Sequence, residues 1–220
     1  MIKTKVRVSP YKGVLTMLVL CMLPLLLNAT THTLRNDLLK LEAVQLIDDM
    51  GKELQNKTGI NAYVIATNEH FPQSYNLVEH CKQYEANISK PYVLFIFAPY
   101  ATITKKSESK GRVGIIPSSD AVRAMYDYDD VRDAGINIVA IKDSNTDEDK
   151  FNIGILQAYS ELADNIAASK GIKLEKTIPN EMGTMVNILR VLVYSGTLIL
   201  LWIFVFRPLW MRMKNGRAEE

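Results

Sequence analysis

Two apolar segments, one near each end of the chain, constrain its fold more than any other feature. The first runs from Val14 to Leu27 and the second from about Val186 to Phe206. Each carries its basic residues on the side away from the middle of the chain: Lys3, Lys5, Arg7 and Lys12 before the first, and Arg207, Arg212, Lys214 and Arg217 after the second. Because basic flanks stay on the cytoplasmic side of a membrane, this pattern predicts that the intervening residues lie outside the cytoplasm, beside a bilayer.

The two apolar segments predict different roles. The first has a basic start, about fourteen apolar residues and a polar exit at Asn28, as in a secretory signal cleaved after Ala29. If it is not cleaved it is an N-terminal anchor, although it is short for a helix that needs about 20 residues to cross the hydrocarbon. The second has the length of a spanning helix. The expected order is a signal or anchor at 1–29, an extracytoplasmic domain at 30–171, a linker at 172–185, a transmembrane helix at 186–206 and a basic cytoplasmic tail at 207–220.

The net charge of +2 conceals an acidic domain between basic ends. From Thr30 to Met185 there are 17 Lys and Arg against 22 Asp and Glu, a net of −5, whereas the flanks carry +7. An acidic domain argues against nucleic acid as a partner, since phosphates need clustered Lys and Arg. The basic tail is expected to contact anionic lipid headgroups. The predicted location is the inner (cytoplasmic) membrane, in a single pass, with the domain on the periplasmic side.

Helix-like and strand-like stretches alternate through the acidic domain. Apolar residues recur at helical spacing from Asn36 to Lys57, and Gly59 supplies a stop. Arg112–Ile116 is expected to pair antiparallel with Tyr92–Ala98 through a Lys-rich loop. These patterns predict a small mixed sheet with helices packed on it. The expected helices are Asn36–Lys57, Tyr75–Glu85, Ala121–Tyr126 and Phe151–Lys170; the expected strands are Asn61–Thr67, Tyr92–Ala98, Arg112–Ile116 and, by composition, Gly135–Ile141.

In its order of elements and three short motifs, the chain resembles the TPM domain family. The motifs are Thr58-Gly59 before the first predicted strand, Arg112-Val113-Gly114 in the hairpin, and Phe151-Asn152-Ile153-Gly154 opening the last helix. The sequence departs from the family where Ser89-Lys90-Pro91 replaces the usual Asp-Gly or Asn-Gly before the central strand. The usual glycine pair after the hairpin strand is also reduced to Gly114, with Pro117 following. The resemblance covers about Asn36 to Ser169.

The resemblance implies a fold and several functions. The fold is an α/β/α sandwich, in agreement with the alternating pattern. Members of the family include chloroplast lumen proteins linked to photosystem II repair, a nematode auxiliary subunit of acetylcholine receptors and bacterial extracytoplasmic proteins. Some TPM domains are reported to bind divalent cations near acidic loops, and acid phosphatase activity has been proposed for some plant members.

Two acidic clusters are candidates for a Ca²⁺ site. Closely spaced Asp and Asn side chains collect the oxygen ligands that this hard cation prefers. The second cluster begins with the spacing of a calcium loop but has Glu148 where an EF-hand needs glycine, so an EF-hand is excluded. The alternative is solvated loop charge. The candidate ligands are Asp120, Asp127, Asp129 and Asp130 in the first cluster, and Asp143, Asn145 and Asp147 in the second.

Other reactive residues are few. Cys81 is expected to be a buried apolar residue, with an intermolecular bridge or a reactive thiol as alternatives, and His32 is expected outside the folded region. Asn87 lies in an acid-x-Asn-x-Ser pattern, which indicates either a bacterial glycosylation acceptor or a helix C-terminal turn. No catalytic motif is present. The sequence therefore predicts a membrane-tethered interaction domain that assists assembly, maintenance or regulation of an integral membrane protein complex, with a divalent-cation-dependent phosphatase as the alternative.

Overall fold

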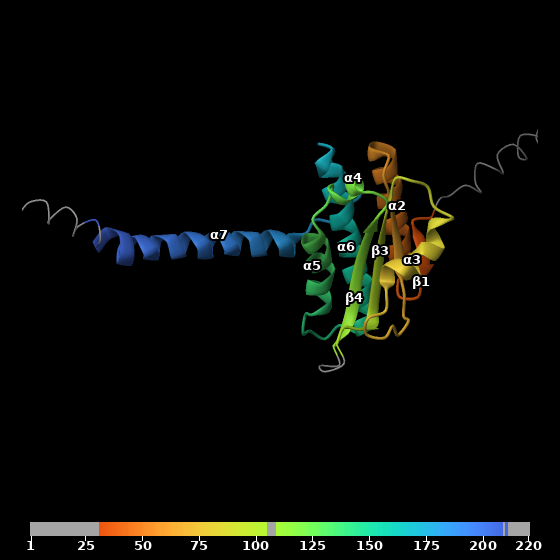
Figure 1. Cartoon of the computed structure of the whole chain (residues 1–220), viewed down its shortest axis with the longest axis horizontal. Coiled ribbons are helices and arrows are strands. Elements are labelled where there is room, and N and C mark those ends of the chain that lie inside the picture. Colours follow the sequence, from red (N-terminus) through yellow and green to blue (C-terminus); the bar gives the residue numbers. More distant parts are fainter. Residues whose placement is uncertain (1–30, 105–108, 209, 211–220) are drawn as a thin grey trace, which may run out of the picture.

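The computed structural model describes residues 31–104, 109–208 and 210 (Figure 1), and the side chains of residues 181–187 and 190 are not described. The expected signal segment at 1–29, the tip of the Lys-rich loop and most of the basic tail lie outside the described residues.

The described chain is a mixed α/β fold on a small four-stranded mixed sheet with the order β1-β2-β3-β4. The first three strands are parallel and the fourth is antiparallel to its neighbour. The predicted hairpin is therefore confirmed, with Ile115 opposite Phe95. The predictions omitted β1, a strand of only four residues. The strands are β1 (Thr33–Asn36), β2 (Asn61–Ala66), β3 (Tyr92–Thr102) and β4 (Lys110–Pro117).

Helix ends follow local capping chemistry. The first helix ends where Gly59 adopts φ +76°, the left-handed conformation that glycine adopts without steric cost. It starts later than predicted, because Asn36 ends β1 and residues 37–40 connect that strand to the helix. Asn76, Ser119, Asp127 and Thr146 each accept backbone N–H groups as N-caps. The helices are α2 (Leu41–Thr58), α3 (Leu77–Glu85), α4 (Asp120–Arg123), α5 (Tyr128–Val139), α6 (Asp147–Ser169), α7 (Glu181–Leu201) and a π-helical turn, η1 (Trp202–Phe206).

The predicted strand Gly135–Ile141 is wrong, because most of it lies in α5. Its Ile and Val residues suggested a strand, but Gly135 has a helical role that composition does not reveal. A Cβ on Gly135 would lie 3.0 Å from the carbonyl oxygen of Gly154 in α6, and a Cβ on Gly154 would lie 2.9 Å from the carbonyl oxygen of Gly135. The two glycines thus allow the backbones of α5 and α6 to touch.

Gly154→Ala is expected to lower the free energy of unfolding by roughly 1–2 kcal/mol. Alanine favours a helix over glycine by about 1 kcal/mol, but its methyl group would push against backbone that cannot rotate away, and overpacking costs about 1–3 kcal/mol or more. Urea unfolding of the full chain measures the difference. Asn137→Ala, at an exposed position of α5, is the control and should change stability little. A more stable Gly154→Ala protein would contradict the close contact.

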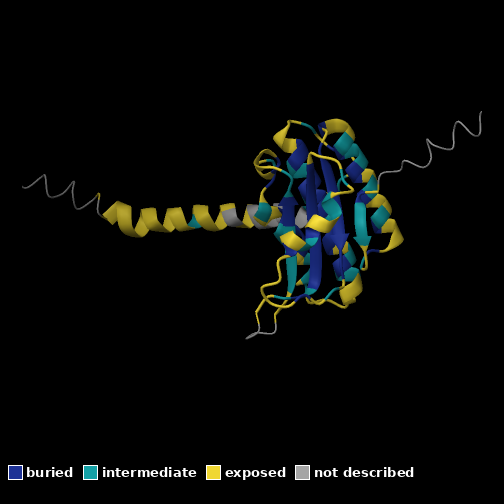
Figure 2. Ribbon diagram, turned by 45° about the vertical axis from the view of Figure 1, so that its right-hand side comes forward, coloured by how far each residue is buried: buried dark blue, intermediate teal, exposed yellow. Residues whose placement is uncertain are grey.

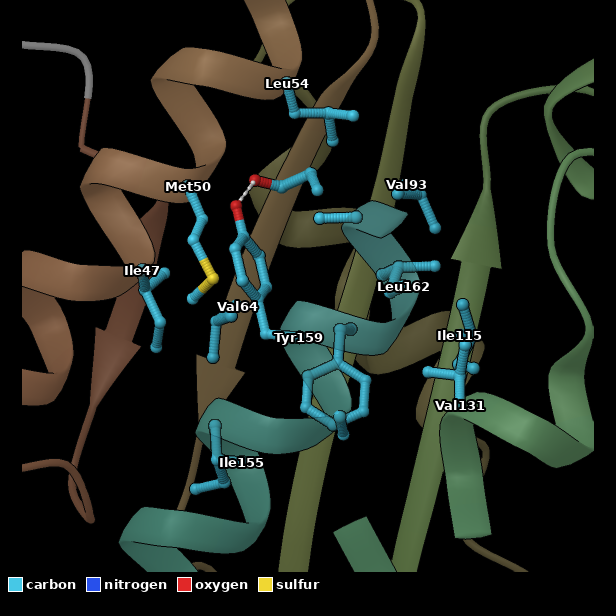
Figure 3. Close-up of a cluster of buried hydrophobic side chains, with 14 of the residues drawn as sticks. Ile47, Met50, Leu54, Val64, Val93, Ile115, Val131, Ile155, Tyr159 and Leu162 are labelled. Carbon is cyan, nitrogen blue, oxygen red and sulfur yellow. Dashed lines mark hydrogen bonds between the residues drawn. The ribbon is translucent and has the colours of Figure 1, made fainter. Parts of the chain in front are cut away.

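Helices cover both faces of the sheet. On one face, Val64 and Phe95 pack against Ile47 of α2 and Tyr159 of α6, in a cluster that also includes Val131 of α5 (Figure 3). On the other face, Ile65, Leu94 and Ile96 pack against Leu77 and Cys81 of α3. Successive residues of β2 and β3 alternate between the two clusters, as the pleat of a strand requires. The prediction that Cys81 is buried is confirmed.

The connections between the parallel strands have opposite hands. The chain passes from β1 to β2 through α2 on one face, and from β2 to β3 through α3 on the other. Both steps move the same way across the sheet, so one connection is left-handed, which such crossovers seldom are. The loops leaving β1 and β2 therefore diverge at their carboxyl ends, where open α/β sheets commonly bind ligands.

Candidate functional site

Helix α7 exposes apolar side chains on every side. Consecutive residues of a helix point in different directions, yet Val191, Leu192 and Val193 are 67, 62 and 56% exposed. The same holds further along, where Leu198 and Phe204 are 67 and 73% exposed (Figure 2). A helix that is apolar all round needs lipid or protein around it. Among the described residues, no helix is both long enough and apolar enough to cross a membrane.

The expected linker is docked on the domain over much of its length. We call residues 172–180 the strap. Leu174 in the strap is buried in the core beside α2 and α6. The Oγ of Ser160 in α6 donates to the carbonyl oxygen of Ile178 at 3.0 Å and accepts its N–H at 2.6 Å. Asn180 donates to Glu161 at 2.9 Å. The strap therefore fixes the place on α6 from which the chain continues into α7.

Carboxylates hold the strap. The two oxygens of Glu53 in α2 accept the N–H groups of Glu175 and Lys176, each at 2.8 Å. Partial burial raises the pKa of Glu53, but the hydrogen bonds from Lys57 and from these two N–H groups outweigh it and leave the pKa below its ordinary value. Burial raises the pKa of Asp164, although a hydrogen bond from Thr177 opposes the rise. The strap is thus bound by a charged carboxylate on α2 and by a half-buried one on α6.

Glu53→Gln is expected to loosen the strap. The amide offers a neutral oxygen and one NH₂ group in place of two charged acceptors, and charge-assisted hydrogen bonds are the stronger kind. We expect hydrogen exchange at the amides of residues 175 and 176 to accelerate several-fold, with little change in β3. Glu42→Gln, in the exposed first turn of α2, is the matched control. Unchanged exchange in the Glu53 variant would show that this carboxylate does not hold the strap.

The first predicted cation cluster lies at helix starts rather than in a loop. Asp127 is the N-cap of α5 and accepts the N–H groups of Asp129 and Asp130 at 2.8 and 3.2 Å. Asp129 also pairs with Arg132 at 2.6 Å. Asp120 opens α4. Carboxylates at these positions stabilise the positive end of the helix dipole, so the structure gives them a role at the starts of α4 and α5.

The second predicted cluster is split between a turn and a helix. Asp143 accepts hydrogen bonds from the backbone and side chain of Asn145 and pairs with Lys150. Burial raises the pKa of Asp143, but these contacts reverse the shift and leave it below its ordinary value. Asp147 stands in the first turn of α6. Within the described residues no group of three or more His, Cys, Asp or Glu could hold a metal ion, and Ca²⁺ binding stays a prediction.

A network of charged residues at the carboxyl ends of β1 and β2 was not predicted. Arg35 pairs with Asp37 at 2.8 Å and with Glu69 in the loop after β2. Asp37 also accepts the N–H of Asn68 at 3.2 Å. Hydrogen bonding to Glu69 raises the pKa of Arg35 further above its already high value. Because the guanidinium and both carboxylates satisfy one another, this network ties the diverging loops together. Arg35 and Glu69 are 34 residues apart in the sequence, so no local sequence pattern predicts that they pair.

His32 is fully buried, so its predicted position outside the folded region is wrong. Its Nδ1 lies 2.9 Å from the carbonyl oxygen of Ala62, which also accepts the hydroxyl of Tyr159 at 2.9 Å. Since a carbonyl can only accept, His32 carries its proton on Nδ1. Its Nε2 is buried without a partner. Burial lowers the pKa of His32, against smaller opposing effects of the Ala62 carbonyl and Asp48. The histidine therefore anchors the start of β1 in its neutral form.

Stability is expected to fall as the pH drops below about 6.5, the pKa of an exposed histidine. The folded-state pKa of His32 is lower than the unfolded value, so acid protonates the unfolded chain first and favours it. From pH 7.5 to 5 the contribution of His32 to the free energy of unfolding should fall by up to about 2 kcal/mol. Urea unfolding at both pH values measures it. His32→Gln should flatten this dependence, whereas His70→Gln, at an exposed ring, should retain it. An equal pH dependence in the His32 variant would contradict this assignment.

Comparison with known proteins adds no relative. No protein-family model matches the chain, and no curated protein matches it.

Proposed function

We propose that the chain is a membrane-tethered extracytoplasmic domain that assists the assembly, maintenance or regulation of an integral membrane protein complex. The observation that carries the proposal is the exposed apolar surface of α7 and η1, from Ile188 to Phe206. Lipid would cover that surface, and the basic residues that follow Phe206 would stay in the cytoplasm. The domain itself would then lie on the periplasmic side of the inner membrane.

An interaction role fits the polar groups of the domain. The carboxylates of the first cluster cap helices or pair with Arg132, and those around Arg35 satisfy one another. Burial raises the pKa of the Cys81 thiol to about 12, which leaves it protonated and a poor nucleophile. These groups serve the fold rather than a reaction. The motifs that resemble TPM proteins support a role beside membrane complexes.

Crosslinking in the native membrane tests the proposal. The full-length chain is crosslinked in intact cells and then purified in detergent. We expect a product larger than the chain that contains an integral membrane protein. A chain in which Leu198 and Leu201 are both changed to Asp serves as control and should lose that product. Recovery of uncrosslinked monomer alone would contradict an assembly role.

Hydrolysis of phosphate esters that needs Ca²⁺ or Mg²⁺ and is lost in Asp129→Ala would favour the phosphatase instead.

A further inference from the structure

We infer that the outer face of α5 rests on the lipid headgroups of the outer surface of the membrane. This inference rests on the proposed function, and it adds which side of the domain meets the bilayer. The occupant of the face is lipid rather than a second protein.

The connection between the domain and α7 is short. The strap ends at Asn180, which is bonded to Glu161 on α6, and α7 begins at the next residue. At 1.5 Å per residue, Val186, where the apolar segment starts, is only about 8 Å along α7 from Glu181. The headgroup region on each side of a bilayer is about 5–8 Å deep. Parts of the domain beside the start of α7 are therefore at the depth of the headgroups.

The second step identifies that part as α5. Some Cα atoms of α5 and α7 lie within 8 Å of each other. Figure 1 shows α5 on the side of the domain from which α7 leaves, and α7 running roughly perpendicular to the strands. If α7 crosses the bilayer, the strands run along the membrane surface, with α5 toward it and β1 away from it.

The third step is the chemistry of the outer face of α5. Val131, Ala134 and Gly135 are buried against the domain, whereas Ile136 is exposed by 39% on the opposite side. Asp129, Ile136 and Ala140 share this exposed side at spacings of seven and four residues. Arg132 pairs with Asp129 at 2.6 Å and with Asp133 at 2.8 Å. The face thus combines the apolar Ile136 and Ala140 with two carboxylates that share one guanidinium. This arrangement suits zwitterionic headgroups better than a strongly anionic surface.

Site-specific fluorescence tests the inference. Single cysteines for an environment-sensitive dye replace Ile136, Val78 or Leu198 in the full-length chain carrying Cys21→Ser. Val78 is the matched control, because it is an exposed apolar residue (51%) on α3, across the sheet from α5. The buried Cys81 should not react. The labelled chains are placed in nanodiscs of phosphatidylcholine and phosphatidylethanolamine that contain lipids spin-labelled either at the headgroup or in the acyl chain.

We expect headgroup-labelled lipid to quench the dye at position 136 at least twofold more than at position 78. Acyl-chain-labelled lipid should quench the dye at position 198. Quenching at 198 with equal quenching at 136 and 78 would overturn the inference and leave the proposed tether intact. A blue-shifted dye at 136 without spin quenching would indicate a protein contact and would also overturn it. No quenching at 198 would instead remove the proposed function on which the inference rests.

Discussion

A chain with both Leu198→Asp and Leu201→Asp is expected to leave the membrane fraction. Both leucines are exposed on α7. Leu198 lies near the middle of the apolar segment 186–206, and Leu201 lies one helical turn closer to its end. Each charge near the centre of a spanning helix costs about 2.5–3.5 kcal/mol, so the pair should disfavour insertion by about 5–7 kcal/mol. Fractionation of cells followed by alkaline carbonate extraction measures the loss.

The matched control separates charge from loss of side-chain volume. A chain with Leu198→Ala and Leu201→Ala stays apolar and should remain in the membrane pellet. The variants are made in a chain from which residues 14–27 are absent after export, which mass spectrometry of the purified chain checks. If the aspartate variant of that chain also stays in the pellet after carbonate extraction, α7 does not hold the chain through contact with lipid.

Tyr159→Ala is expected to lower the free energy of unfolding by about 3–5 kcal/mol, the cost of truncating a buried aromatic residue. Tyr159 is fully buried in α6 between Ile47, Met50 and Val64 (Figure 3). Burial raises the pKa of its hydroxyl well above the ordinary value, so the group is a neutral donor to Ala62. A domain of ordinary stability, about 5–15 kcal/mol, would lose a large share of it. Urea unfolding of the full chain measures the change.

Tyr159→Phe isolates the hydroxyl. The ring remains, and the carbonyl oxygen of Ala62 still accepts the N–H of His32 Nδ1, so the cost should be about 1 kcal/mol. Equal destabilisation by phenylalanine and alanine would show that the hydroxyl, and not the packing of the ring, supports this part of the core.

The parts of the fold that could be predicted were those with a local signal. β2 and β3 are short, continuous apolar runs, and both are buried throughout most of their length. The end of α2 was marked by Gly59, whose positive φ needs no partner elsewhere in the chain. Such features depend on residues that are close in the sequence, so they can be recognised from the sequence alone.

The features that were missed depend on distant partners. β1 has four residues and pairs with β2, some thirty residues away, while His32 and Tyr159 of α6 bond the same carbonyl oxygen, that of Ala62. The chain from Gly135 to Val139 has the composition of a strand, but it is helical, and its close packing on α6 through Gly135 and Gly154 depends on a residue far along the chain. Cations were predicted from acidic clusters without knowing that α5 and α6 begin there, and helix starts favour acidic residues for their own reason.

The expected linker is, over residues 172–180, a segment docked on the domain. The sequence predicted a linker at 172–185, yet Leu174, Ile178 and Asn180 contact α2 or α6. This docking links the position of the domain to the direction of α7, and the orientation inferred for α5 depends on it.

A membrane-tethered extracytoplasmic domain and its basic tail must lie on opposite sides of the inner membrane, and thiol labelling measures this. Chains carrying Cys21→Ser and a single new cysteine, Val78→Cys in the domain or Asn215→Cys in the tail, are treated in intact bacterial cells with a thiol reagent that cannot cross the inner membrane. We expect labelling at position 78 in intact cells, and labelling at position 215 only after the cells are broken. Labelling of the tail in intact cells, or protection of the domain until lysis, would contradict it.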